Sequence, residues 1–369
     1  MSKKERLTFG DLEEDVIDRG ICAMCRGCVT FCSAGSLHAL TIREDKPAYL
    51  DEEACVKCGI CYLICPRTED LEAALRKRYG YEPPAGRYLE VGSLRTTSQE
   101  IRSVCSDGGV VTGLLTYMLE SGIIDGAVVS RKEELWNNQP MLATTPQDLL
   151  EGAGTSMAVS ASVEDLSDYT TYVPTLLAIR SLRASDLTRV AAVGTPCQIK
   201  TLRKMQLLQI VPAHIVRFTV GLFCYENLQF THEGGRQLEE KIGAPLSEVT
   251  KINIKEDFIV RLGDGATVHI DLDELGDLVR PECIPCIDFS NYTADISVGG
   301  LGSADGYTTT MIRSRRAKAL VEEAVAKGYL ERDDDVDEEG LRGKIEEMAW
   351  RKHRRGTDRL RQLGVNWAY

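Results

Sequence analysis

Several features that mark other kinds of protein are absent from this sequence. It has no run of about 18 apolar residues, the length that a membrane-spanning helix needs. Its charged first residues, 1–6, lead into no apolar stretch, so no secretion signal is expected and the predicted location is the cytoplasm. A net charge of -12 argues against nucleic-acid binding as the main role.

The residue patterns of several enzyme classes are also absent. No nucleophile triad, H-E-x-x-H zinc helix or Walker A phosphate loop occurs. The five histidines are scattered along the chain, and none is assigned a role. With 369 residues, 43% of them hydrophobic, the chain is long enough for roughly two or three domains of ordinary soluble type. Nothing here indicates hydrolysis by a side-chain nucleophile or ATP-driven chemistry.

Cysteine, by contrast, is abundant. The chain has 13 cysteines, too many to expect by chance in a cytoplasmic protein. Disulfide bonds are an alternative explanation, but no export signal is expected and the spacings do not suit a secreted scaffold. Because the cysteines fall into two dense clusters and a sparse set, we interpret them as metal ligands.

Two four-cysteine runs near the N-terminus carry the strongest signal. Each has the spacing C-x2-C-x2-C-x3-C of bacterial ferredoxins, in which the fourth cysteine ligates the cluster of the other run. Two structural zinc knuckles are the alternative, which the repeated spacing makes improbable. Ser33 stands where the first run usually has proline, which affects the turn but leaves the ligands intact. We assign one 4Fe-4S cluster (cluster I) to Cys22, Cys25, Cys28 and Cys65, and a second (cluster II) to Cys55, Cys58, Cys61 and Cys32.

Four of the remaining cysteines lie near the ends of elements that we expect to be buried. A small apolar run, 190–193, leads into a Gly-Thr-Pro-Cys-Gln turn at 194–198 and then into a helix. A second strand-like run, 215–223, also ends on a cysteine, and a C-x-x-C pair follows at 283–286. Ordinary buried thiols are the alternative for each of them. Together they suggest one metal site built from distant parts of a domain, with Cys197, Cys224, Cys283 and Cys286.

A Ser-Asp-Gly-Gly turn at 106–109 precedes an apolar helix expected over 110–121. Such a turn exposes backbone N–H groups and the positive end of the helix dipole, which favour a phosphate or pyrophosphate. An ordinary helix cap is the more common explanation. Cys105, just before the turn, has no near partner in the sequence and is interpreted as a spare thiol.

These signals divide the chain into four parts. We expect a two-cluster ferredoxin domain at 1–70, a linker at 71–100 with a short helix near 71–78, an α/β (α+β) domain at 101–330 and a charged tail at 331–369. Residues 340–369 hold eight Lys/Arg against three Asp/Glu, about +5 in charge; a solvated helix is the default interpretation and a docking segment for an acidic partner the alternative. In the third part we expect strands at 123–129, 251–255, 258–262 and 267–270, and helices at 148–153, 167–172, 172–184, 231–249 and 315–327.

With these residues in place, the sequence resembles the coenzyme F420 hydrogenase/dehydrogenase beta-subunit family. The resemblance runs from about residue 100 to 327, and the preceding ferredoxin pair resembles the longer family members that feed electrons into larger complexes. It is carried by the 106–109 turn with Thr112, the 194–198 turn, and the stretches 223–227, 283–289 and 294–299.

The resemblance implies a flavoprotein domain that exchanges hydride between coenzyme F420, as substrate, and FAD. It also implies a third 4Fe-4S cluster beside the flavin, held by the same Cys197, Cys224, Cys283 and Cys286. A flavin can take up a hydride and release electrons singly, and iron–sulfur clusters can conduct them. The residues expected to bind FAD are Ser106, Gly108, Gly109, Thr112, Gly194, Thr195, Pro196, Gln198, Asn253 and Lys255.

The implied partners are coenzyme F420 and the other subunits of a larger redox complex. That complex could be a hydrogenase, a formate or formylmethanofuran dehydrogenase, a heterodisulfide reductase or a quinone-reducing complex. A ferredoxin-dependent reductase of another substrate and a plain electron-transfer module without flavin are the competing hypotheses. Because coenzyme F420 is anionic, we also expect a local basic patch, drawn from Lys200, Arg203, Lys204, Lys251, Lys255 and Arg313.

Overall fold

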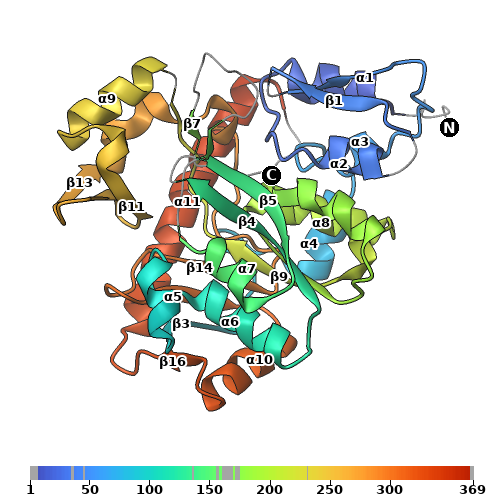
Figure 1. The fold of residues 1–369 in the computed structure, drawn as a ribbon. Helices are drawn as coiled ribbons and strands as arrows, with labels where there is room; N and C mark the ends of the chain where they lie inside the picture. Colours follow the sequence, from blue (N-terminus) through green and yellow to red (C-terminus); the bar gives the residue numbers. More distant parts are fainter. Residues whose placement is uncertain are drawn as a thin grey trace.

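A mixed eight-stranded sheet forms the centre of the larger part of the chain (Figure 1). The structure, a computed structural model, describes residues 7–34, 37–44, 46–134, 137–154, 158–159, 169–170, 175–230 and 232–365. Four neighbouring strands, β14, β9, β8 and β4, run parallel, and antiparallel strands extend the sheet on both sides. The order across the sheet is β16 (Leu330–Arg332), β3 (Glu90–Thr96), β15 (Thr308–Ile312), β14 (Ile296–Gly299), β9 (Val216–Leu222), β8 (Val190–Gly194), β4 (Gly126–Glu134) and β5 (Asn137–Ala143).

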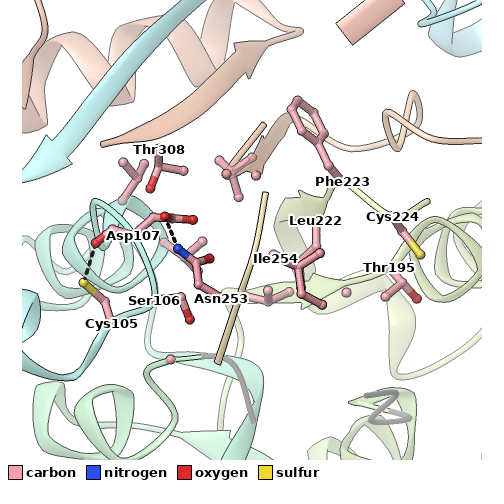
Figure 2. A pocket seen from close by; sticks show the side chains of 18 of the residues that line it. Cys105, Ser106, Asp107, Thr195, Leu222, Phe223, Cys224, Asn253, Ile254 and Thr308 are labelled. Carbon is pink, nitrogen blue, oxygen red and sulfur yellow. Dashed lines mark hydrogen bonds between the residues drawn. The ribbon is translucent and has the colours of Figure 1, made fainter. Parts of the chain in front are cut away.

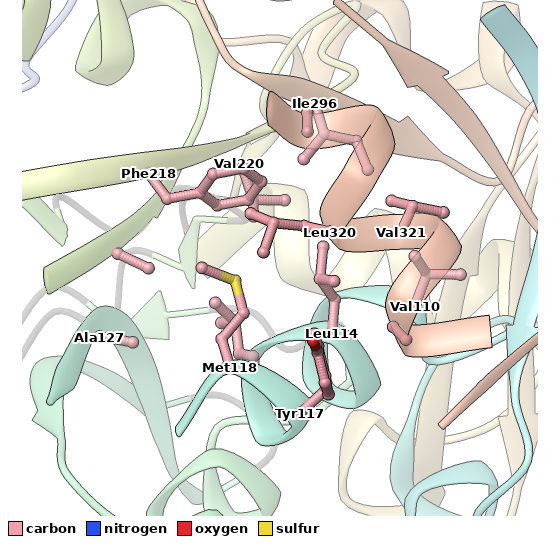
Figure 3. Packing of buried hydrophobic residues seen from close by; sticks show 14 of the residues in the cluster. Val110, Leu114, Tyr117, Met118, Ala127, Phe218, Val220, Ile296, Leu320 and Val321 are labelled. Carbon is pink, nitrogen blue, oxygen red and sulfur yellow. The ribbon is translucent and has the colours of Figure 1, made fainter. Parts of the chain in front are cut away.

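Helices cover both faces of this sheet, and the alternation of side chains along each strand explains how. On one face, Ala127 and Phe218 pack against α6 (Val110–Glu120) and α10 (Arg315–Ala326), as Figure 3 shows. Ala191 belongs to the same cluster. On the other face, the neighbouring residues Val128, Val190 and Ala192 pack against α8 (Pro196–Leu207) and the 3-10 helix η2 (Thr175–Ala184). Parallel strands that are buried on both faces read as continuous apolar runs, which is why residues 190–193 were recognisable in the sequence.

The ferredoxin part packs beside α8 (Figure 1). Its core gathers around Phe9, Val29 and Leu40. It consists of α1 (Phe9–Leu12), which continues as a π-helical turn (Glu13–Ile17), then α2 (Gly27–Ala34), the hairpin β1 (Leu40–Arg43) and β2 (Lys46–Tyr49), and α3 (Ile60–Leu63).

A smaller lobe carries a core of its own. It consists of α9 (His232–Ile242), a 3-10 turn (Leu246–Glu248) and a three-stranded antiparallel sheet of β11 (Val249–Ile254), β12 (Asp257–Leu262) and β13 (Thr267–Asp271). The three expected strands of this lobe and their hairpin turn are confirmed, with Gly265 at a φ of 91° in the turn. The single helix expected over 231–249 is wrong, because it ends at Ile242 and a separate turn follows.

The expected linker at 71–100 is wrong in its second half. Its short helix is present as α4 (Glu72–Tyr79), but residues 90–96 form β3, a strand inside the main sheet. The buried residues of β3 include Gly92, Ser93 and Thr96, which do not look apolar in the sequence. Hydrogen bonding compensates for their burial, since the Ser93 hydroxyl bonds the Ser303 hydroxyl at 2.9 Å.

Other boundaries shift by a few residues. The helix at 110–121 is confirmed as α6 and that at 315–327 as α10, while the expected strand at 123–129 begins later, at Gly126. The helix expected at 148–153 is α7 (Pro146–Glu151). The helix expected at 167–172 is wrong where it is described, because Tyr169–Thr170 form β7, paired with β6 (Ala158–Val159) and β10 (Gln229–Phe230); residues 167, 168, 171 and 172 lie outside the described residues.

The charged tail forms one long helix, α11 (Glu338–Gln362), and it is not fully solvated. One stripe is buried: Leu341, Ile345 and Ala349 pack near the main sheet, and Leu360 and Val365 join the core of the ferredoxin part. The apolar positions recur at helical spacing among the charges, a pattern hidden when only net charge is counted. The helix therefore connects the two parts of its own chain.

Candidate functional site

A cavity of about 390 Å³ opens where the parallel strands β8, β9 and β14 end (Figure 2). The carboxyl ends of parallel strands are where open α/β sheets bind their ligands. The walls are largely apolar, with residues from the sheet, α6, β11 and the start of α8. The size falls within the usual range of ligand pockets.

The structure brings most of the predicted FAD-binding residues to this cavity. Gly108 and Pro196 do not line it, but each is next to residues that do. The Gly108 backbone N–H donates to the Thr308 hydroxyl at 3.0 Å, and a Cβ there would lie 2.6 Å from the Leu94 carbonyl oxygen, so only glycine fits. The predicted residues that line the cavity are Ser106, Gly109, Thr112, Gly194, Thr195, Gln198, Asn253 and Lys255.

Asp107 is a cavity residue to which the sequence analysis gave no role, although it lies within the quoted Ser-Asp-Gly-Gly turn. Its Oδ1 accepts a hydrogen bond from Asn253 Nδ2 at 2.7 Å and lies 3.7 Å from Lys255 Nζ (Figure 2). Burial raises the pKa of Asp107, although the Asn253 hydrogen bond and the Lys255 charge oppose the shift. Gly300 permits this approach, because a Cβ there would lie 2.7 Å from Asp107 Oδ2. Asp107 thus joins the α6 turn to β11.

Cys105 also lines the cavity. It is buried, and its Sγ donates to the Asp107 carbonyl at 2.8 Å. Burial raises the pKa of this thiol. The residue read as a spare thiol therefore belongs to the wall of the candidate site.

Two amides hold the Gly194–Gln198 turn in place. Gln198 Oε1 accepts from the Thr195 backbone N–H at 3.1 Å and from the Thr175 hydroxyl at 3.0 Å. Asn291, which the sequence analysis missed, donates from Nδ2 to the Gly194 carbonyl at 2.9 Å and has a φ of 60°. Its 0% exposure and its contact with the ends of two strands make it a positioning residue. No local sequence signal distinguishes it from any other asparagine.

The four sparse cysteines converge beside the cavity. Cys224 lines it, and the Cys224 thiol interacts electrostatically with the thiols of Cys283, Cys286 and Cys197. Burial raises the pKa of Cys224 to about 12. Burial also opposes ionisation of Cys286, but the charges of Lys352 and Arg67 outweigh it and lower the pKa to about 7. We call these four residues the third thiol group.

The ferredoxin cysteines gather into the two sets that their spacing predicts. A small apolar void is lined by Cys32 together with Cys55, Cys58 and Cys61. Burial raises the pKa of Cys28, and the thiols that act on it are, in decreasing order, Cys22, Cys25, Cys65 and, from the other set, Cys61. In the described part of the chain, no three His, Cys, Asp or Glu side chains are grouped as ligands of one metal ion. A cubane spreads its four thiolates over four irons, more widely than a single tetrahedral zinc does.

The third thiol group lies next to the cluster I cysteines. Thr201 Oγ1 is 3.4 Å from Cys25 Sγ and donates to the Cys197 carbonyl at 2.9 Å. Arg67, two residues after Cys65, donates to the Pro285 carbonyl at 3.2 Å, within the C-x-x-C loop. Both contacts join the ferredoxin part to the large domain at the two sets of thiols.

The expected basic patch is wrong for most of its members, because these cations are buried and paired. Lys200 Nζ lies 3.2 Å from Glu72 Oε1, and Arg203 binds Asp295 at 2.9 Å. Lys204 donates to the Cys65 carbonyl at 2.6 Å, and burial lowers its pKa to about 8. Lys255 is buried and 2.9 Å from Asp305, and Arg313 donates to Ser297 Oγ at 2.8 Å. Lys251 is half-buried, and its charge acts on Asp107 and Cys105 at the cavity.

Comparison with protein families finds three matched segments. Residues 93–166 match the N-terminal part, and residues 187–338 the C-terminal part, of the coenzyme F420 hydrogenase/dehydrogenase beta subunit. Residues 48–67 match a 4Fe-4S binding domain. In the described part of the chain, no helix combines the length and apolarity needed to cross a bilayer.

Individual relatives agree with these matches. The coenzyme F420 hydrogenase subunit beta of Methanosarcina barkeri is 33% identical over 257 residues, covering 68% of this chain and 83% of the relative. A coenzyme F420-dependent sulfite reductase of Methanocaldococcus jannaschii is 28% identical over 362 residues, and the match spans 94% of this chain but only 52% of that protein. A chain in the solved F420-reducing NiFe hydrogenase complex of M. barkeri aligns with a TM-score of 0.67 at 30% identity, over 76% of this chain and 94% of that one.

Proposed function

Because the chain belongs to the coenzyme F420 hydrogenase/dehydrogenase beta-subunit family, we propose that it exchanges electrons between coenzyme F420 and a partner redox protein. In this proposal FAD occupies the cavity and three 4Fe-4S clusters occupy the three sets of thiols. One observation carries it: Cys224 belongs both to the cavity wall and to the third thiol group. A flavin site and a metal site that share a residue suit electron transfer between them.

The residues that line the cavity supply the kinds of groups that FAD needs. The glycine turn at the start of α6 supplies a helix N-terminus for the diphosphate, lined by Ser106, Gly109 and Thr112, while Gly108 lets the turn pack closely against Leu94 and Thr308. Gly194, Thr195 and Gln198 form a second wall, in the turn that Asn291 holds and after which Pro196 begins α8, and Asn253 and Lys255 form a third. When bound, FAD would supply a carrier that takes hydride and passes on single electrons. Asp107 keeps the Lys255 charge at this wall.

The third thiol group fits a 4Fe-4S cluster by its donor chemistry. Four cysteines from three separate segments approach one another, and cysteine thiolates are the usual ligands of such clusters. The same chemistry applies to the two ferredoxin sets. These thiols form a series through the protein: Cys224 at the cavity, Cys197 and Cys25 on either side of Thr201, and Cys58 exposed at the far end. Such a series is what a relay from a buried flavin to an outside partner needs.

The exposed end of this series is the proposed contact with the partner. Val56, which lines the same void as Cys58, has an apolar side chain that is 59% exposed. The partner would be another subunit or module of one of the redox complexes named above. The match to half of a larger reductase is consistent with a chain that hands electrons to a separate catalytic unit.

The proposal is tested by purification without oxygen, followed by flavin and iron analysis and an assay of coenzyme F420H2 oxidation. We expect bound FAD and oxidation of the deazaflavin with an artificial electron acceptor. Bound flavin without deazaflavin turnover would instead support a reductase of another substrate. Protein that holds its clusters but no flavin would be a plain electron-transfer module.

A further inference from the structure

Lys352 is a buried cation that lies within 4 Å of no carboxylate among the described residues. It lies on α11 with 1% of its surface exposed, and its Nζ donates to the Cys224 backbone carbonyl. Among the described residues, no carboxylate forms an ion pair with it. Its charge acts instead on Cys286, Cys224 and Cys283, and then on Asp288. The ammonium is therefore hydrogen-bonded to the loop of Cys224, and its charge acts on three of the four cysteines of the third thiol group.

Packing alone does not explain a lysine at this position. The other buried positions along the helix include Leu341, Ile345, Ala349 and Leu360, which are apolar. Burying an unpaired ammonium costs several kcal/mol, whereas an apolar side chain would fill the stripe without that cost. The lysine is favourable only opposite negative charge, which the cluster thiolates would provide together with the buried Asp288, whose effect on Lys352 ranks after those of the three cysteines.

The neighbouring turn of α11 holds the lysine in place. Arg355 pairs with Glu226 at 2.6 Å, on the loop that follows Cys224. Gly356 packs against the C-x-x-C loop, since a Cβ there would lie 2.5 Å from the Cys286 carbonyl oxygen. The helix thus contacts two of the three segments that carry thiols of the third group, the Cys224 loop and the C-x-x-C loop. All of α11 after its first residue lies beyond the segment matched to the family, 187–338.

We propose that Lys352 is a positioning residue of the third cluster. The lysine holds the ligand loops of the cluster together and raises the reduction potential of the cluster. Reduction adds one electron, and so one negative charge, to a cluster at this site, and breaks no bond. A fixed positive charge nearby stabilises the reduced form more than the oxidised form. Net charge, hydrogen bonding and burial are the factors by which proteins adjust such potentials. This inference rests on the third cluster of the proposed function.

The test compares three variants of the cluster-loaded, oxygen-free protein. Lys352→Met removes the charge at similar size, Lys352→Arg keeps it, and Lys344→Met removes an exposed charge from the same helix, where it pairs with Glu256 at 3.1 Å. Redox titration followed by electron paramagnetic resonance gives the potentials, and the signal missing in Cys286→Ser identifies the third cluster. Iron content is measured for every sample.

We expect Lys352→Met to move only the third cluster to a more negative potential. At a fixed solution potential, the ratio of reduced to oxidised third cluster should fall by about tenfold, which corresponds to 59 mV for one electron. Lys352→Arg and Lys344→Met should keep the wild-type value. Loss of the third cluster in Lys352→Met but not in Lys352→Arg would also support the proposal.

Two results would overturn it: an unchanged potential in Lys352→Met, or equal effects of Lys352→Met and Lys352→Arg. Wild-type protein that binds only about eight irons would instead refute the third cluster itself, at four irons per cubane. The two failures are therefore distinguishable.

Discussion

The close packing of α11 against the C-x-x-C loop can be tested with two glycines of the same helix. Gly356 is buried, and an added Cβ would lie 2.5 Å from the Cys286 carbonyl oxygen and 2.8 Å from its carbon. Gly343 is exposed, and an added Cβ would meet no atom within 4 Å. The substitutions Gly356→Ala and Gly343→Ala therefore differ only in the contact that the new methyl group makes.

The two variants should differ in stability, with Gly356→Ala the less stable of the two. Replacing glycine by alanine inside a helix stabilises it by about 1 kcal/mol, and this gain applies to both. At Gly356 the methyl group meets backbone, which cannot rotate away, and overpacking of this kind costs about 1–3 kcal/mol. The helix contribution cancels in the difference between the variants, which should be about 1–3 kcal/mol in favour of Gly343→Ala.

The assay is thermal unfolding of both variants under the same oxygen-free conditions and heating rate. At roughly 2 °C per kcal/mol, the midpoints should differ by roughly 2–6 °C. Release of iron to a chelator should also be faster in Gly356→Ala, because the displaced loop carries two of the proposed cluster ligands. If Gly356→Ala were stabilised as much as Gly343→Ala, the close contact between α11 and this loop would be refuted.

Three further predictions concern the clusters and one buried ion pair. Cys286→Ser should lower the iron content from about 12 to about 8 per chain, at four irons per cubane, while colorimetric iron analysis of Cys105→Ser should show no loss. Cys58→Ala should damage cluster II and slow electron delivery to a partner, yet leave flavin reduction by F420H2 in a single turnover intact; lost reduction with FAD still bound would contradict the division between the two parts. Burial opposes ionisation of Glu72, but the charges of Lys200, Lys204 and Arg76 outweigh burial and lower its pKa to about 2. The ionised carboxylate should therefore stabilise the fold above the usual pKa of 4.5, and this contribution should be lost as the pH falls from 4.5 toward 2. In thermal unfolding, Glu72→Gln should be less stable than wild type by about 3–5 kcal/mol at pH 7 and by a smaller amount at pH 4. An equal loss of stability at both pH values would contradict this. The control Glu82→Gln, which removes an exposed ion pair with Arg87, should change stability little.

Sequence patterns were informative where one short segment carries its own chemistry. The ferredoxin spacing predicted which thiols share a site, and Cys32 does lie with Cys55, Cys58 and Cys61 around one void. The apolar run before Gly194 predicted β8, because a strand buried on both faces has no polar alternation to obscure it. Proline and the capping residues then mark where α8 begins.

The same patterns failed where a residue's role depends on a distant partner. β3 looked like a linker because its small polar residues are compatible with burial only beside β15. Lys200 and Lys204 looked like surface cations, and only the fold shows Glu72 and the Cys65 carbonyl beside them. α11 looked solvated because its apolar stripe is diluted by charges on the other faces.

The sequence by itself determined the two ferredoxin cysteine runs, the strand–turn–helix around Cys197 and the family to which the chain is related, because each is encoded in local spacing. Only the tertiary structure decided that Cys224 belongs to the cavity wall, that Thr201 separates Cys25 from Cys197, and that Lys352 faces the third thiol group. Those relations join residues more than a hundred positions apart in most cases. Their proximity follows from how the sheet, α8 and α11 pack together, which no local pattern records.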